Sequence, residues 1–225
     1  MTRFKTLVLV LGLVGFSAIA AETRFDFLVR EDFFSGFAGN GVALERGMKT
    51  CEAILAKNPG NAEALVWHGC GLSFISGQLF QKGDFAKGME LFERGVKEMQ
   101  DAVALEPDNV GVLIPRGATL LTATRAMPPG ANTRKLLAQG LSDYEKTDEL
   151  QKSYFDTLSG HARGELLFGL AEGYLRAGNE AKAREYFARL AAIGPGSGHE
   201  ATANAWLATG KLDPKGVTCT GCHAK

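Results

Sequence analysis

The chain has 225 residues with 25 Lys and Arg against 25 Asp and Glu, so its formal net charge at pH 7 is zero. A balance this even provides no electrostatic field for nucleic acid or an anionic membrane, and it excludes both as expected partners of the folded body. Hydrophobic residues make up 45% of the chain, which excludes disorder across the body, and the length suits one domain or a short array of repeats.

Residues 1–20 are typical of a secretory signal peptide. Arg3 and Lys5 form a short positive segment, an apolar run extends from Leu7 to Phe16, and Ala18-Ile19-Ala20 provides small residues for cleavage. The run is shorter than the about 20 residues that a transmembrane helix needs, and no second apolar stretch follows. We expect a cleaved peptide, a periplasmic or secreted protein, and no membrane contact beyond the peptide. The alternative is an uncleaved N-terminal anchor.

The sequence pattern of residues 21–209 predicts helices, because no strand-like alternation of apolar and polar residues extends beyond a few residues. We expect a first helical hairpin from about Phe27 to Pro59 and a second from Asn61 to Pro107. The second should turn at Lys82-Gly83-Asp84, with the side chain of Asp84 capping the helix that follows.

Two more hairpins and a last helix follow along the chain. The third hairpin should extend from Asn109 to about Leu150 and turn at Pro128-Pro129-Gly130, and the fourth from about Thr157 to Pro195. The glycine-rich segment 194–198 then breaks the chain before a helix from Glu200 to Thr209. Residues 210–225 form a tail.

The helical part contains internal repeats. Asn61 to Leu72 and Asn109 to Leu120 place Asn, Leu, Gly and Leu at the same positions, 48 residues apart, and each block follows a proline turn. A third segment has helical-repeat residues at Leu167, Leu170, Ala171, Tyr174, Gly178, Ala183, Phe187, Leu190 and Pro195.

In spacing and residue type this third segment resembles the tetratricopeptide repeat. The resemblance implies an all-α fold: a right-handed α-solenoid of about four tetratricopeptide-like hairpins, with a capping helix and a C-terminal tail. Small residues should let the two helices of a hairpin approach closely, and large ones should fill the space between hairpins. The small residues are Gly69, Gly117, Ala171 and Ala183, and the large ones are Leu65, Leu113, Tyr174 and Phe187.

In the tetratricopeptide family the first helices of the hairpins form a concave face that binds peptides or partner proteins. Carried over by position, the resemblance implies a candidate partner groove made of Glu63, Val66, Cys70, Ile114, Ala118, Leu121, Phe168 and Glu172. The alternatives are a face that is only solvated, or one covered by the tail of the same chain.

The tail contains Cys219-Thr220-Gly221-Cys222-His223, which has the spacing of a c-type haem attachment motif. Cys219 and Cys222 would bind one haem covalently through thioethers, and His223 would be the proximal ligand of the iron. Export fits this chemistry, because such haem is attached outside the cytoplasm. We expect electron transfer with a redox partner. The alternatives are a redox-active dithiol, a zinc site that lacks its fourth ligand, and a vestigial or docking tail without haem.

The distal haem ligand is not identified by the sequence. The candidates share an iron-binding side chain upstream of the motif, and each of them is otherwise an ordinary packed or exposed helix residue. They are His68, His161, His199, Met48, Met89, Met99 and Met127.

Cys51 and Cys70 are predicted on neighbouring helices of the first two hairpins. A disulfide between them would close a short loop and stabilise the fold by about 2–4 kcal/mol. Two separate buried thiols are the equal alternative.

No set of residues argues for an enzyme. There is no glycine-rich phosphate loop after a strand, and His68 has no partner with metalloprotease spacing. An acidic run with two lysines is expected to be a solvated helix face; its members are Asp143, Glu145, Lys146, Asp148, Glu149 and Lys152.

Overall fold

A computed structural model of the chain describes residues 24–212, and within them it contains nine α-helices and no strand. The predicted signal peptide, residues 1–20, and the Cys-x-x-Cys-His motif lie outside the described residues.

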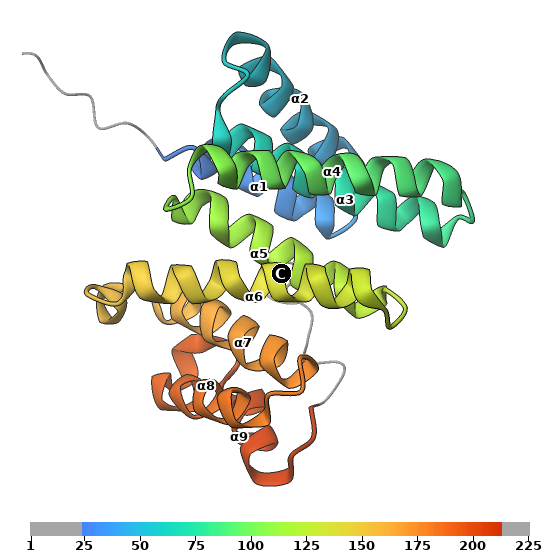
Figure 1. Cartoon of the computed structure of the whole chain (residues 1–225). Coiled ribbons are helices and arrows are strands. Elements are labelled where there is room, and N and C mark those ends of the chain that lie inside the picture. Colours follow the sequence, from blue (N-terminus) through green and yellow to red (C-terminus); the bar gives the residue numbers. More distant parts are fainter. Residues whose placement is uncertain (1–23, 213–225) are drawn as a thin grey trace, which may run out of the picture.

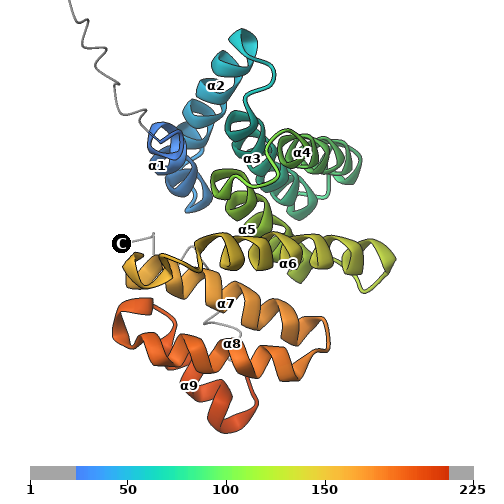
Figure 2. The same ribbon diagram turned by 60° about the vertical axis from the view of Figure 1, so that its left-hand side comes forward.

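The first eight helices form four hairpins that are stacked in chain order, and α9 covers the last one (Figures 1 and 2). Neighbouring helices pack as in a helical solenoid, so the predicted fold class is confirmed. The pairs are α1 (Asp26–Phe37) with α2 (Gly41–Lys57), α3 (Ala62–Gln81) with α4 (Phe85–Leu105), α5 (Val110–Ala126) with α6 (Ala131–Gln151), and α7 (Gly160–Arg176) with α8 (Glu180–Ile193). The remaining elements are α9 (Glu200–Thr209) and two short 3-10 helices, η1 (Phe155–Thr157) and η2 (Pro195–Ser197).

The turns form where capping residues and glycines stand in the sequence. Asn61 and Asn109, which open the two repeated blocks, are the N-caps of α3 and α5: their side chains accept from the backbone N–H groups of Ala64 and Gly111. Asp84 caps α4 by accepting from the N–H of Lys87 at 3.3 Å, as predicted.

The glycines of the repeats allow the two helices of a hairpin to approach each other. A Cβ atom at Gly69 would lie 2.6 Å from the carbonyl oxygen of Gly95 on α4, and one at Gly117 would meet the ring of Tyr144 on α6 at 2.5 Å. Neither position has room for a methyl group. The predicted role of these small residues is therefore confirmed.

The core has two parts. The first cluster fills the space among α1 to α5 and extends to Leu136 of α6; it includes Phe33, Trp67 and Met99. The second fills α5 to α9, where Phe187 stacks on Trp206 of α9 with ring centroids 4.5 Å apart. By covering Phe187, α9 closes the apolar end of the stack.

The α3–α4 hairpin is the longest of the four, with helices of 20 and 21 residues. The helices of the first hairpin have 12 and 17 residues, and those of the fourth have 17 and 14. The turn end of the α3–α4 hairpin consequently projects beyond the neighbouring hairpins (Figure 1).

Candidate functional site

The predicted haem residues Cys219, Cys222 and His223 lie within residues 213–225, outside the described residues. As a donor set they fit a covalent haem, because two thiols separated by two residues and an adjacent imidazole are what this group requires. Leu212, the last described residue before them, packs against the second core cluster. The described residues therefore bear on two other parts of the site: the second axial ligand and the partner groove.

Two of the three candidate histidines are enclosed in ion pairs. His68 is 3% exposed, with Nδ1 2.5 Å from Glu98 Oε2 and Nε2 3.5 Å from Glu52 Oε1. His199 is 4% exposed, stacks on the ring of Phe168, and has Nε2 2.9 Å from Glu165 Oε1. A haem iron could reach neither imidazole without opening the fold and breaking these contacts.

His161 differs from both, because it is exposed in the first turn of α7. The methionines divide in a similar way. Met48 and Met99 are core residues, Met127 is partly buried against the first cluster, and Met89 is exposed. Among the described candidates, His161 and Met89 are therefore the ones whose side chains are exposed.

The predicted partner groove is largely closed. Val66, Leu121, Phe168 and Glu172 are each at most 3% exposed, and Cys70 is buried as well, so their assignment to an open binding face is wrong. The reason is that α3, α5 and α7 pack directly against one another, and each helix covers this face of the next.

What remains accessible on this face is small. Glu63 and Ala118 are partly exposed and Ile114 is exposed, and the carboxylate of Glu63 accepts a hydrogen bond from Asn109 Nδ2 at 3.0 Å. A hollow between α5 and α7, lined partly by Arg125 and Glu165, has a volume of about 10 Å³. This is room for about one water molecule and not for a peptide side chain.

A buried ionic cluster joins α5 to α7 beside this hollow. Glu172 Oε1 accepts from Arg125 Nε at 3.1 Å and lies 2.7 Å from Arg176 Nε. Arg176 also donates to Thr124 Oγ1 and to the carbonyl of Leu121. Burial lowers the pKa of Arg176 against the opposing effect of Glu172. Because these contacts connect α5 to α7, the cluster joins the third and fourth hairpins.

The acidic run on α6 was predicted to be a solvated face, and this is wrong for Asp143. Its side chain is 3% exposed and accepts two hydrogen bonds from Arg116, at 2.7 and 2.5 Å. Burial raises the pKa of Asp143, although Arg116 acts in the opposite direction. No local pattern in the sequence indicates this pair, because the two residues are 27 positions apart.

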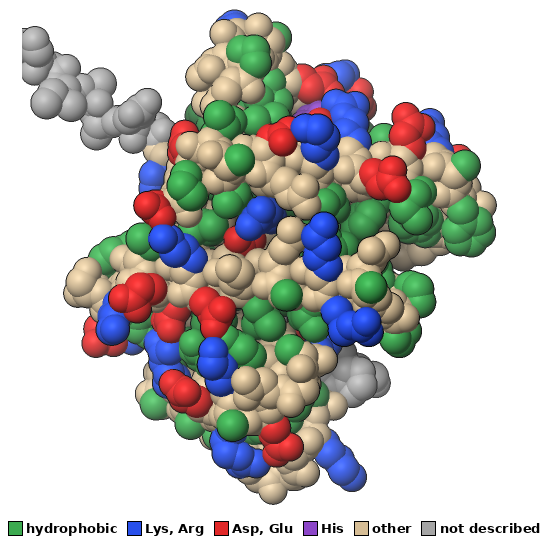
Figure 3. Space-filling model, in the orientation of Figure 1, with side chains coloured by type: hydrophobic (Ala, Val, Ile, Leu, Met, Phe, Trp, Pro, Cys, Tyr) green, Lys and Arg blue, Asp and Glu red, His purple; other side chains and the backbone are tan. Residues whose placement is uncertain are grey.

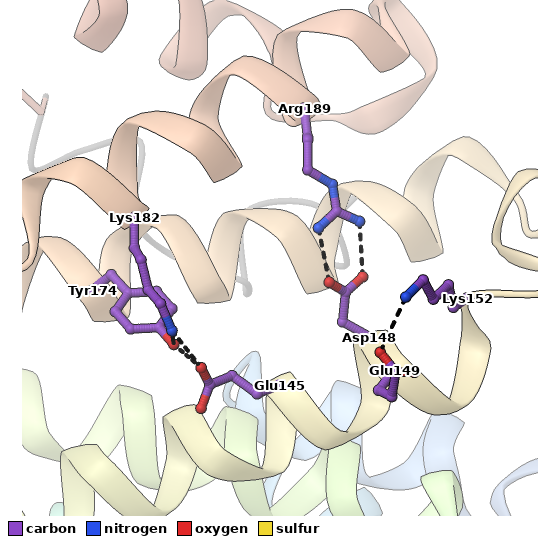
Figure 4. Close-up of polar contacts among 7 residues, drawn as sticks. All are labelled: Glu145, Asp148, Glu149, Lys152, Tyr174, Lys182 and Arg189. Carbon is purple, nitrogen blue, oxygen red and sulfur yellow. Dashed lines mark hydrogen bonds and ion pairs between the residues drawn. The ribbon is translucent and has the colours of Figure 1, made fainter.

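The rest of the run connects α6 to the fourth hairpin (Figure 4). Arg189 of α8 donates to both carboxylate oxygens of Asp148 at 2.8 Å, and Glu145 accepts from Tyr174 and Lys182. Lys146, Glu149 and Lys152 are solvated as predicted, with side chains 48%, 73% and 75% exposed.

Cys51 and Cys70 are free, buried thiols. Thr119 donates to Cys70 Sγ at 3.0 Å, and the sulfur lies 3.5 Å from the carbonyl of Pro115. Burial raises the pKa of both thiols to about 12. Because the thiolate is the reactive form, both cysteines behave as small core residues at neutral pH.

The described surface has few other features of a binding site. A further hollow, of about 560 Å³, is a wide-open strip along α2, and every residue that lines it belongs to that helix; they include Val42, Lys49 and Lys57. Among residues 24–212 no three His, Cys, Asp or Glu side chains are grouped so as to hold a metal ion. None of the described helices is both long and apolar enough to span a bilayer.

Comparison with known proteins adds no relative. No protein-family model matches the chain, and no curated protein matches it.

Proposed function

We propose that this chain is an exported helical-repeat protein that carries one covalent haem c after its last helix and exchanges electrons with a protein partner. The observation that carries the proposal is the Cys219-Thr220-Gly221-Cys222-His223 motif in a chain that opens with a signal-peptide pattern. Both features belong to the same route, because c-type haem is attached after export.

In this proposal Cys219 and Cys222 hold the porphyrin through thioethers, and His223 occupies one axial position of the iron. When bound, the haem supplies a one-electron redox couple. His68 and His199 are unsuitable as the second axial ligand, because both imidazoles are buried and face carboxylates. Among the histidines and methionines of residues 24–212, those with exposed side chains are His161 and Met89. The proposed chemistry is outer-sphere electron transfer, because oxygen chemistry needs a shaped distal pocket around the iron.

The helical stack, which resembles tetratricopeptide repeats in sequence, would present the haem to its partner. Five of the groove positions implied by that resemblance are enclosed in the fold, so the partner-binding part of the proposal is limited to the surface around Ile114. A haem-free scaffold with a dithiol or vestigial tail is the competing function.

The proposal is tested by producing the full chain in a host that exports proteins and attaches haem c. We expect the denatured protein to retain haem stain, to show a c-type α-band when reduced, and to carry the added mass of one haem. The Cys219→Ser/Cys222→Ser variant should lose all three signals and keep the far-UV circular dichroism of the parent. A parent protein that is colourless and has no added mass would leave only the scaffold function.

A further inference from the structure

The projecting end of the α3–α4 hairpin carries apolar side chains that no other part of the described fold covers. Phe85 is 67% exposed and Met89 is 49% exposed, and both belong to the apolar face of α4 that is buried against α3 further along the helix. The extra turns of this hairpin have no neighbouring hairpin against which to pack. Figure 3 shows the resulting group of apolar side chains at the right-hand end.

This apolar tip, defined as Phe80, Phe85 and Met89, is a fixed structure. The rings of Phe80 and Phe85 stack with centroids 6.3 Å apart. Phe80 lies directly over Gly88, where a Cβ atom would be 2.7 Å from the ring. The tip is therefore held in place before any partner binds. Large exposed apolar groups of this kind mark interaction sites.

Four exposed cations lie on this side of the stack: Lys82 and Lys87 beside the tip, and Arg134 and Lys135 near the start of α6. Figures 1 and 2 place the start of α6 on the same side of the stack as the α3–α4 turn.

These edge cations are unusual for this protein, because none of the four forms an ion pair. The other Lys and Arg side chains of residues 24–212 are ion-paired, except for Lys57 and Lys211. Two exposed carboxylates lie among these cations: Asp84, which accepts the N–H that caps α4, and Glu90, three residues after Lys87 on α4. Four cations against these two carboxylates leave this edge with an excess of positive charge, which the neutral total of the chain does not reveal.

We propose that this edge binds an anionic phospholipid surface, with the apolar tip entering the boundary of the acyl chains and the edge cations facing the headgroup phosphates. A projecting end with no groove matches a flat bilayer, and its unpaired cations complement anionic headgroups. The sequence alone excluded a membrane partner because it averages charge over the chain. This inference does not depend on haem attachment.

The test is co-sedimentation of the full chain, isolated after export, with vesicles of phosphatidylglycerol and phosphatidylethanolamine or of phosphatidylcholine alone. We expect binding to the anionic vesicles only, and weaker binding as salt is raised. Phe85→Ser/Met89→Ser should weaken binding about tenfold or more, because two apolar side chains are lost from the boundary. Lys82→Gln and Lys135→Gln should each weaken it about fivefold, as expected for one cation near an anionic surface.

The matched control is Val42→Ser/Leu105→Ser, which removes two exposed apolar side chains outside the edge, at residues 72% and 51% exposed. It should bind vesicles like the parent, and all variants should keep the parent's thermal unfolding. Equal binding by the tip variant and the parent, or no binding to anionic vesicles, would overturn the proposal. Loss of a lipid-free oligomer or protein complex in the tip variant, without any vesicle binding by the parent, would assign the tip to a protein partner instead.

Discussion

Gly69 and Gly77 are both on α3, yet a methyl group should have opposite effects at the two positions. At Gly69 it would lie 2.6 Å from the backbone oxygen of Gly95, whereas nothing lies within 4 Å at Gly77. We expect Gly69→Ala to lower the free energy of unfolding by about 1–3 kcal/mol through overpacking. Gly77→Ala should raise it by up to about 1 kcal/mol, because alanine favours the helix. Urea unfolding of both variants checks this, and changes of the same sign would contradict the packing of α3 on α4.

Glu98 should make stability depend on pH on the acid side. Burial acts to raise the pKa of its carboxyl, but hydrogen bonds and charge from His68 and Arg94 outweigh burial, and the net shift is downward. Because the folded pKa is below the unfolded one, the ionised carboxylate stabilises the fold above the unfolded pKa. This contribution is lost as the pH falls through the folded value. Glu98→Gln should therefore cost about 1–2 kcal/mol at pH 7 and much less near pH 3.

The measurement is a series of urea midpoints from pH 7 to pH 3 for the parent and for Glu98→Gln. Lys97→Gln is the control, because Lys97 is on the same helix and its ion pair with Asp101 is exposed. A constant gap between the parent and Glu98→Gln across this range would show that the carboxylate has no special role in the fold.

At the scale of elements, the sequence predicts the helices and turns well because their signals are local. The Asp84 cap, the Pro128-Pro129-Gly130 turn and the repeated Asn61 and Asn109 each act through their own backbone neighbourhood. The groove was not predictable in this way. Whether Val66 or Phe168 faces solvent depends on how closely successive hairpins pack, which no single repeat encodes. The Arg116–Asp143 pair was not predictable either, because its two residues are 27 positions apart, on the two helices of one hairpin.

The capping helix α9 should stabilise mainly its own end of the stack, because each repeat contacts only its neighbours. The chain has one tryptophan in each core cluster: Trp206 in the second and Trp67 in the first. Trp206→Ala should cost about 3–5 kcal/mol and increase hydrogen exchange in α7 and α8 more than in α3 and α4. Trp67→Ala should increase hydrogen exchange in α3 and α4 more than in α7 and α8. Hydrogen-exchange mass spectrometry measures both patterns. Uniform loss of protection in both variants would mean that the two clusters unfold as one unit.

At the scale of the whole molecule, the four cysteines separate into a core pair and a tail pair with different chemistry. Cys51 and Cys70 are enclosed and have a pKa of about 12, so a thiol reagent at neutral pH should reach them only after unfolding. Cys219 and Cys222, if joined to haem, should not react in either state. Thiol titration in native and denatured protein therefore reports on both pairs at once.

With haem attached, we expect no reactive thiol in the native protein and two after denaturation. A reduced tail without haem would give two reactive thiols in the native protein and four after denaturation. Disulfides in both pairs would give no reactive thiol in either state. The variant Cys51→Ala/Cys70→Ala shows which cysteines react after denaturation. With haem attached, this variant should have no reactive thiol before or after denaturation. Two thiols that react in the native parent, together with an unchanged count in this variant, would place free sulfur on the tail and contradict thioether attachment there.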